Sequence, residues 1–141
     1  MTDGLGLIGL GRLGRVRAEI AARRVPGARL VAVHDIDTDR NAATAAEFGA
    51  AAVESVEGLV GHPDVDGVIV ATPTPLHVAP VTAVAEAGKP LFCEKPLAST
   101  LDDTRQLVDT IDGAGIVCQI GFIRRHDPDH IEARQLIADG R

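Results

Sequence analysis

The sequence predicts one α/β domain with a doubly wound parallel sheet. Apolar runs of about four to six residues alternate with longer segments whose apolar residues recur at helical spacing. That alternation is typical of βαβ units, in which crossover helices join parallel strands. The length of 141 residues, with 45% hydrophobic and 24% charged residues, suits a single globular domain with its own core.

Strands are predicted where apolar residues run without interruption. In chain order they cover residues 5–8, 29–35, 51–53, 67–71, 91–93 and 116–121. The run at 67–71, GVIVA, contains no polar side chain, as expected of a strand that is covered on both faces. The signal at 51–53 is the weakest of the six.

Helices are predicted where apolar residues share one helical face and a cap or a stop lies nearby. In chain order they cover residues 12–24, 39–48, 76–87, 100–112 and 129–139, with a short helical turn at 56–60. Glycines after the second and fourth helices end them, and Pro73 and Pro75 delay the fourth until about Leu76. The pattern Thr100-x-x-Asp103 is a capping signal that opens the fifth.

Charge and composition exclude several classes of partner. The formal net charge of −6 disfavours nucleic acids and anionic membranes. With three Phe and no Trp or Tyr, the chain has few rings on which bases could stack. The apolar stretch at 5–10 is too short to span a membrane and has no basic leader. We therefore expect neither a nucleic-acid nor a membrane partner.

A glycine-rich turn joins the first predicted strand to the first predicted helix. Residues 9–14 read GLGRLG and match the pattern GxGxxG. Gly9 permits a tight turn, Gly11 lets a pyrophosphate approach the backbone, and Gly14 lets the helix pack closely on the sheet. Free N–H groups at the helix start favour a phosphate, and Arg12 adds positive charge. The pattern predicts a dinucleotide site and the Rossmann strand order 3-2-1-4-5-6.

Asp35 ends the second predicted strand, about 20 residues after the last glycine of the turn. Its carboxylate would accept hydrogen bonds from the adenosine ribose and repel a 2′-phosphate, which favours NAD over NADP. No basic residue directly follows Asp35 to reverse that preference. An alternative stays open, in which the glycine turn binds no ligand and Asp35 is a turn or cap residue.

Three further loops should meet the glycine turn, because the loops after successive parallel strands face one crevice. They read TPTPLH after the fourth strand, EKP after the fifth and GFIRR after the sixth. Lys95, in the second of these, is suited to hydrogen-bond a substrate hydroxyl and to assist proton removal as a hydride leaves. By its charge alone, it is equally compatible with a solvated surface lysine.

With these loops included, the chain resembles the N-terminal half of the Gfo/Idh/MocA family of oxidoreductases. GLGRLG, VAVHDID, HPDVDGVIVATPTPLH, GKPLFCEKPLA and GFIRRHDP occur in the order and spacing of that family. The EKPLA and GFxRR segments look similar to those of myo-inositol 2-dehydrogenases. The resemblance implies that residues 1–141 are a dinucleotide-binding Rossmann domain, truncated before a C-terminal substrate and oligomerisation domain.

The resemblance also implies roles for individual residues. Lys95 matches a catalytic lysine that touches both the nicotinamide and the substrate, and the proline after it is expected to be cis. Arg124 matches a position that can line the sugar site, although an ion-pair role for it stays open. The cofactor-binding residues that the resemblance implies are Gly9, Gly11, Arg12, Leu13, Gly14, Asp35, Ala71, Thr72, Pro73, His77, Glu94 and Lys95.

The activity implied is that of an NAD-dependent dehydrogenase that transfers a hydride between nicotinamide and a secondary alcohol of a sugar or inositol-like cyclitol. Family members are more than twice as long, and their second domain supplies an Asp and a His that complete catalysis. We therefore expect the isolated chain to bind NAD but to be inactive, and the full-length enzyme to be a cytoplasmic homo-oligomer. Two alternatives stay open: a stand-alone NAD(H)-binding module without its own catalysis, and a Rossmann fold for a nucleotide sugar or adenosylmethionine.

Other residue types add no further site. Cys93 and Cys118 lie far apart in apolar runs and form no CxxC pair, so we predict two buried thiols in a reducing cytoplasm. The segment HDPDH at 126–130 offers two imidazoles and two carboxylates, but Pro128 breaks the spacing that a helical metal site needs. We expect a helix N-terminus decorated by Asp there, and no metal.

Overall fold

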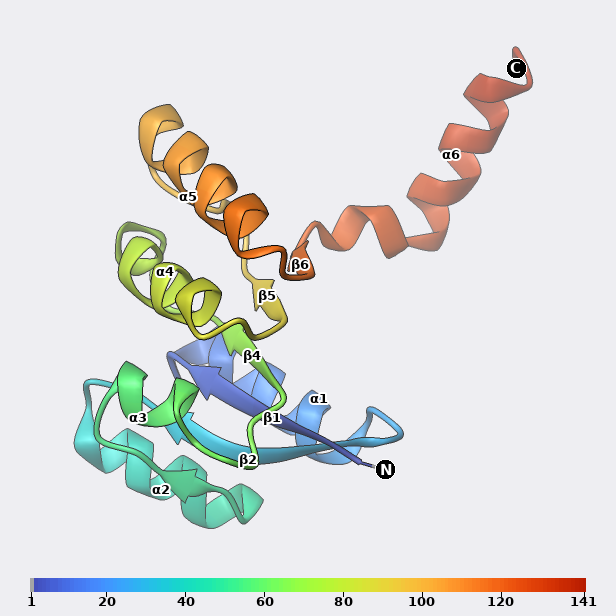
Figure 1. The fold of residues 1–141 in the computed structure, drawn as a ribbon. Helices are drawn as coiled ribbons and strands as arrows, with labels where there is room; N and C mark the ends of the chain where they lie inside the picture. The colour runs from blue at the N-terminus through green and yellow to red at the C-terminus, as the bar shows by residue number, and fades with distance from the viewer. Residues whose placement is uncertain (1) are drawn as a thin grey trace.

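The computed structural model describes residues 2–141 and shows a six-stranded sheet with helices on both faces (Figure 1). Met1, the first residue of the predicted domain, lies outside the described residues. The strand order is β3-β2-β1-β4-β5-β6, and all neighbouring strands are parallel. The predicted doubly wound α/β fold and its order 3-2-1-4-5-6 are confirmed.

Each predicted strand is present, with small differences at the ends. The strands are β1 (Asp3–Ile8), β2 (Ala28–His34), β3 (Ala51–Ala52), β4 (Gly67–Val70), β5 (Leu91–Cys93) and β6 (Cys118–Ile120). β6 is shorter than predicted because β5, its neighbour, offers only the three residues Leu91–Cys93 for pairing. β3 pairs with β2 over two residues, in keeping with its weak sequence signal.

The predicted helices are also present. They are α1 (Arg12–Arg23), α2 (Thr38–Phe48), α3 (Val56–Val60), α4 (Val78–Glu86), α5 (Leu101–Ala114) and α6 (Pro128–Ala138). The predicted cap of α5 forms, since the Asp103 N–H donates to Thr100 Oγ1 at 3.1 Å. α4 begins later than predicted because residues Thr74–Leu76 form a separate 3-10 turn, η1, which tolerates Pro75. A second such turn, η2 (Ile123–His126), precedes α6 and was not predicted.

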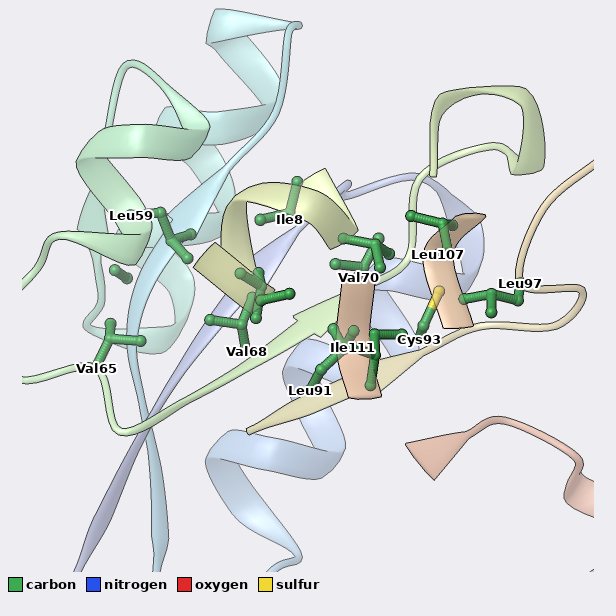
Figure 2. Packing of buried hydrophobic residues seen from close by; sticks show 14 of the residues in the cluster. Ile8, Leu59, Val65, Val68, Val70, Leu91, Cys93, Leu97, Leu107 and Ile111 are labelled. Atoms are coloured by element: carbon green, nitrogen blue, oxygen red, sulfur yellow. The ribbon is translucent and has the colours of Figure 1, made fainter. Parts of the chain in front are cut away.

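Two apolar clusters cover the two faces of the sheet. On one face Leu7 of β1 belongs to the same cluster as Ala18 of α1. On the other face Ile8 of β1 belongs to the cluster that contains Leu107 and Ile111 of α5, and Figure 2 shows these side chains together. Leu7 and Ile8 point to opposite faces, as successive residues of a strand must. The burial of both faces explains the uninterrupted apolar runs of the central strands.

A β-bulge interrupts the ladder between β1 and β2. Leu5 pairs with Leu30, whereas Gly6 pairs with Ala32, so Val31 is an extra residue in β2. Val31 and Ala32 therefore both contribute to the α5-side cluster instead of alternating between the two faces. A bulge of this kind bends its strand and increases the local twist of the sheet.

α6 lies apart from both clusters. None of its residues is buried, and Figure 1 shows it extending away from the sheet beyond β6. Among residues 2–141, no helix is both long enough and apolar enough to span a bilayer.

Candidate functional site

A cavity of about 860 Å³ opens at the carboxyl ends of β1, β2, β4 and β5. It lies where the strand order reverses between β1 and β4, which is where open α/β sheets bind ligands. Its size falls within the range of about 300 to 1,000 Å³ that is typical of small-molecule sites. The sequence-predicted residues that line it are Gly9, Gly11, Arg12, Leu13, Asp35, Ala71, Thr72, Pro73, Glu94 and Lys95.

The three glycines of the turn meet different surroundings. Gly9 has a φ of +89°, and a Cβ there would lie 2.6 Å from the backbone nitrogen of Thr72. A Cβ at Gly14 would lie 1.9 Å from the Gly9 carbonyl oxygen, so the helix packs as closely as predicted. A Cβ at Gly11 would meet no atom within 4 Å. The protein itself therefore does not require glycine at Gly11, whereas a ligand lying against the backbone does.

The N-terminus of α1 is open to the cavity. Its N-cap residue, Gly11, makes no side-chain cap bond, and its first turn holds no acidic residue. The N–H of Arg15 donates to the Gly11 carbonyl at 2.9 Å, so the N–H groups before Arg15 have no partner within the helix. Gly11, Arg12 and Leu13 all lie on the cavity wall. The helix dipole and the Arg12 charge together favour an anion such as a phosphate here.

Asp35 ties β2 to the glycine turn. Its Oδ2 accepts the Leu10 N–H at 2.6 Å, and its Oδ1 accepts the Asp37 N–H at 2.9 Å. Asp35 therefore does act as a turn residue, which was the alternative role considered for it. Because a carboxylate offers about four acceptor positions, Asp35 keeps capacity for ribose hydroxyls on the cavity side. The turn role and the cofactor role are compatible, and the residues present fit a dinucleotide.

Arg40 is a residue of this site that the sequence analysis missed. It lines the cavity, its Nη2 lies 2.7 Å from Asp37 Oδ2, and its Nη1 lies 3.5 Å from Asp35 Oδ2. Hydrogen bonds from the Arg40 backbone N–H and guanidinium hold the pKa of Asp37 below its ordinary value. No basic residue directly follows Asp35, but the first turn of α2 brings Arg40 back to it. The i, i+3 spacing of Asp37 and Arg40 was the available signal.

Glu94 and Lys95 follow β5 and share the cavity wall. Glu94 is buried and accepts hydrogen bonds from Arg17 of α1, a second residue that the sequence analysis missed. Lys95 is exposed, and within residues 2–141 it forms no ion pair. The bond between Lys95 and Pro96 is cis, as the resemblance implied.

His77 lies behind the cavity wall and not on it. Its side chain is buried, and its Nε2 lies 2.9 Å from the Thr72 carbonyl oxygen. Its Nδ1 lies 3.0 Å from the Pro96 carbonyl oxygen and 3.2 Å from that of Leu97. The structure thus places His77 as a tie between the loop after β4 and the loop after β5, where it supports residues that line the site.

Arg124 lies outside the cavity. It is exposed in η2, and its Nη1 lies 2.7 Å from Asp127 Oδ2, so the structure shows the ion pair that was its alternative role. That bond from Arg124 lowers the pKa of Asp127. Asp127 Oδ1 also accepts the Asp129 N–H, which confirms the predicted Asp-decorated helix N-terminus. In the described part of the chain, no three His, Cys, Asp or Glu side chains are grouped to hold a metal ion.

The two cysteines are free thiols in different surroundings. Cys93 is fully buried, with its Sγ 3.5 Å from His77 Nδ1, and burial raises its pKa to about 12. Cys118 is only partly buried because β6 is an edge strand, and burial raises its pKa as well. The prediction of a buried thiol is confirmed for Cys93 and was too strong for Cys118.

A parallel sheet of this order, with a glycine turn at its switch point, is characteristic of dinucleotide-binding Rossmann domains. Within that class the chain belongs to the Gfo/Idh/MocA family, because residues 4–122 match the family described as "Oxidoreductase family, NAD-binding Rossmann fold". NAD is therefore the cofactor of this domain.

The chain is similar to one part of several longer relatives. Inositol 2-dehydrogenase 3 of Saccharopolyspora erythraea is 40% identical over 99% of this chain and 42% of its own length. The 1,5-anhydro-D-fructose reductase of Ensifer adhaerens is 42% identical over 96% of this chain and 41% of its own. The crystal structure of myo-inositol dehydrogenase from Lactobacillus casei with NAD(H) and myo-inositol aligns with a TM-score of 0.94 and 32% identity, over 99% of this chain and 42% of that one. The chain spans about two fifths of these relatives' length.

Proposed function

We propose that this chain is the cofactor domain of a dehydrogenase that acts on a secondary alcohol of a cyclitol or sugar, and that a further domain completes the enzyme. The observation that carries the proposal is that Lys95 shares one cavity with the glycine turn and Asp35. A group suited to handle a substrate hydroxyl thus lies within the cofactor site. The names of the relatives, inositol dehydrogenases and an anhydrofructose reductase, support a polyol or its ketone as the substrate class.

Different residues of the cavity bind different parts of the cofactor in this proposal. The N–H groups at the start of α1 bind the pyrophosphate, with Arg12 adding positive charge. Asp35 accepts hydrogen bonds from the adenosine ribose and disfavours a 2′-phosphate. Thr72 and Pro73 line the same cavity as Lys95. NAD, when bound, supplies the carbon that accepts the hydride.

Lys95 acts on the substrate oxygen. Its ammonium donates a hydrogen bond to the hydroxyl, which orients the carbon that carries the hydride. As the hydroxyl proton passes to a base that the further domain supplies, the same charge stabilises the negative charge that develops on the oxygen. Lys95 is exposed in this domain, so the water-excluding wall on its far side belongs to the second domain in this proposal.

Calorimetric titration with NADH and NADPH, in the wild type and in Asp35→Ser, tests the cofactor part. We expect NADH to bind more tightly than NADPH, and the substitution to abolish or invert that preference. Equal binding of both cofactors by the wild type would contradict the role given to Asp35.

A turnover assay tests the catalytic part. The chain is mixed with NAD⁺ and either myo-inositol or scyllo-inositol, and NADH absorbance is followed. We expect binding without robust turnover, because a second domain supplies the missing catalytic groups. Robust turnover by the 141-residue chain would refute the need for that domain.

The setting and assembly of the enzyme are part of the same proposal. Two free thiols, one of them fully buried, suit a reducing cytoplasm. We place homo-oligomerisation in the longer protein, since the resemblance assigns much of that interface to the second domain. Sedimentation of the chain separates this proposal from a stand-alone module, which would form a stable oligomer without the second domain.

A further inference from the structure

A buried ion pair joins α1 to the end of β5. Arg17 lies on α1, and its Nε and Nη2 lie 2.6 and 2.5 Å from Oε1 of Glu94. The Arg17 side chain is 19% exposed and that of Glu94 is 7% exposed. Both charges are thus largely shielded from water. The pair is therefore held in one geometry more firmly than an exposed surface pair would be.

Arg17 approaches Glu94 from outside the cofactor cavity. Its guanidinium carbon lies 5.2 Å from the centroid of the Phe92 ring, within the range of a cation–π contact. Glu94 lines the cofactor cavity, whereas Arg17 and Phe92 line a separate apolar hollow on the α1 side of the sheet. Among these residues Glu94 is the contact of Arg17 that also lines the cofactor cavity.

The other carboxylate oxygen of Glu94 lies against Gly121, just after β6. A Cβ at Gly121 would stand 2.9 Å from Glu94 Oε2 and 3.2 Å from Cζ of Phe92. Glycine at this position leaves the space that the carboxylate occupies. Arg17 on one oxygen and Gly121 beside the other together fix where the Glu94 charge lies.

Lys95 is the next residue in the chain and lines the same cavity. Its ammonium forms no ion pair among the described residues, and the carboxylate of the preceding residue, Glu94, is bound to Arg17. An ammonium that pairs with a carboxylate holds its proton more firmly and is less available to another oxygen. A pairing of Glu94 with the Lys95 ammonium would therefore lower the reactivity of the lysine amine.

We propose that Arg17 is a positioning residue for Lys95, because its pairing with Glu94 withholds that carboxylate from the lysine ammonium. The consequence for hydride transfer rests on the function proposed above. The reactivity of the lysine amine, however, is measurable without cofactor or substrate, so this inference and the proposed function fail separately.

The chain suits a direct test because it contains only two lysines, Lys89 and Lys95. Lys89 donates to the Val65 carbonyl oxygen, away from the cavity, and serves as the internal reference amine. The folded, cofactor-free chain is treated briefly with acetic anhydride, and peptide mass spectrometry gives the ratio of Lys95 to Lys89 acetylation. We expect Arg17→Ala to lower this ratio about two- to fivefold, as Glu94 pairs with Lys95 instead.

Arg15→Ala is the matched control. Arg15 lies two positions earlier on α1 and forms an exposed pair with Glu47 at 2.7 Å, so its loss should leave the acetylation ratio unchanged. The double variant Arg17→Ala with Glu94→Ala removes both charges, and its ratio should return to near the wild-type value.

Circular dichroism establishes that each variant is folded. If Arg17→Ala does not fold, Arg17→Gln removes the charge but keeps a hydrogen-bond donor, and it should lower the ratio in the same direction. An unchanged ratio in a folded Arg17 variant would overturn the proposal, as would a ratio that stays low in the double variant. NADH titration of the same samples reports on the proposed function independently.

Discussion

The carbonyl oxygen of Gly9 occupies the place where a side chain at Gly14 would have to begin. The distance from that oxygen to a Cβ built at Gly14 is 1.9 Å, far inside van der Waals contact. The backbone of the turn thus packs directly against the backbone of α1. Within the glycine pattern, Gly14 is needed for this packing, whereas Gly11 leaves space for a ligand.

Gly14→Ala and Gly11→Ala should separate these two roles. We expect Gly14→Ala to destabilise the domain by about 3 kcal/mol, because the new methyl group displaces the turn. Gly11→Ala should leave the unfolding free energy nearly unchanged and weaken NADH binding at least tenfold, since the methyl group fills space that the pyrophosphate needs. Urea unfolding and NADH titration of both variants measure this. Full NADH affinity in Gly11→Ala would contradict the assignment.

Arg40 should moderate the preference for NADH that Asp35 creates. It is the cation beside Asp35, with Nη1 3.5 Å from Oδ2, and it would attract a 2′-phosphate. Arg40→Ala is expected to weaken NADPH binding about two- to fivefold more than NADH binding, as loss of one exposed charge contact implies. Parallel titrations with the two cofactors measure the change, and Arg105→Ala, an exposed arginine on α5, is the control. A larger loss for NADH would refute the prediction.

His77 should be important for stability although it does not line the cavity. His77→Ala removes the ring whose nitrogens face the carbonyl oxygens of Thr72, Pro96 and Leu97, and it leaves a void. We expect a loss of about 2–4 kcal/mol in urea unfolding, together with weaker NADH binding as the two loops lose their tie. His126→Ala, at an exposed position in η2, should change neither quantity.

The buried thiol of Cys93 should make the domain sensitive to alkali. The thiol ionises near its ordinary pKa of 9.0 in the unfolded chain but stays protonated to about 12 in the folded domain. Its contribution to stability is therefore complete below pH 9 and is lost as the pH rises towards 12, at about 1.4 kcal/mol per pH unit. The fall in unfolding free energy between about pH 8 and about pH 10 should be larger for the wild type than for Cys93→Ala. An equal fall in unfolding free energy in both proteins would contradict the prediction, because ionisation of Cys93 would then not set the pH dependence.

Most of the fold was predictable because the strands centre on runs of apolar residues and most helices carry a local stop or cap. The 3-10 turns were not, since their bonds are set by where Pro75 and the loop after β6 lie in the folded domain. The β-bulge at Val31 also has no local signal, because it depends on how β2 pairs with β1.

Site residues that belong to a sequence motif were predictable, whereas residues whose role depends on a tertiary contact were less so. The glycine turn, Asp35 and the loops after β4 and β5 meet at one cavity because parallel strands end together. The position of His77 behind the wall could not be read from its motif, because a ring that hydrogen-bonds backbone carbonyls leaves no pattern in the sequence. Arg17 escaped prediction for a similar reason, since its partner, Glu94, follows β5 far along the chain.

The separation of α6 from the sheet divides the domain into parts of unequal stability. A helix of 11 residues with none of them buried gains little from tertiary packing, and isolated helices of that length are marginal in water. Its backbone amides should exchange with solvent deuterium at rates near those of an unstructured peptide, whereas the amides of β1 and β4 should exchange only when the whole sheet opens. An unfolding curve that follows the sheet would therefore report nothing about α6.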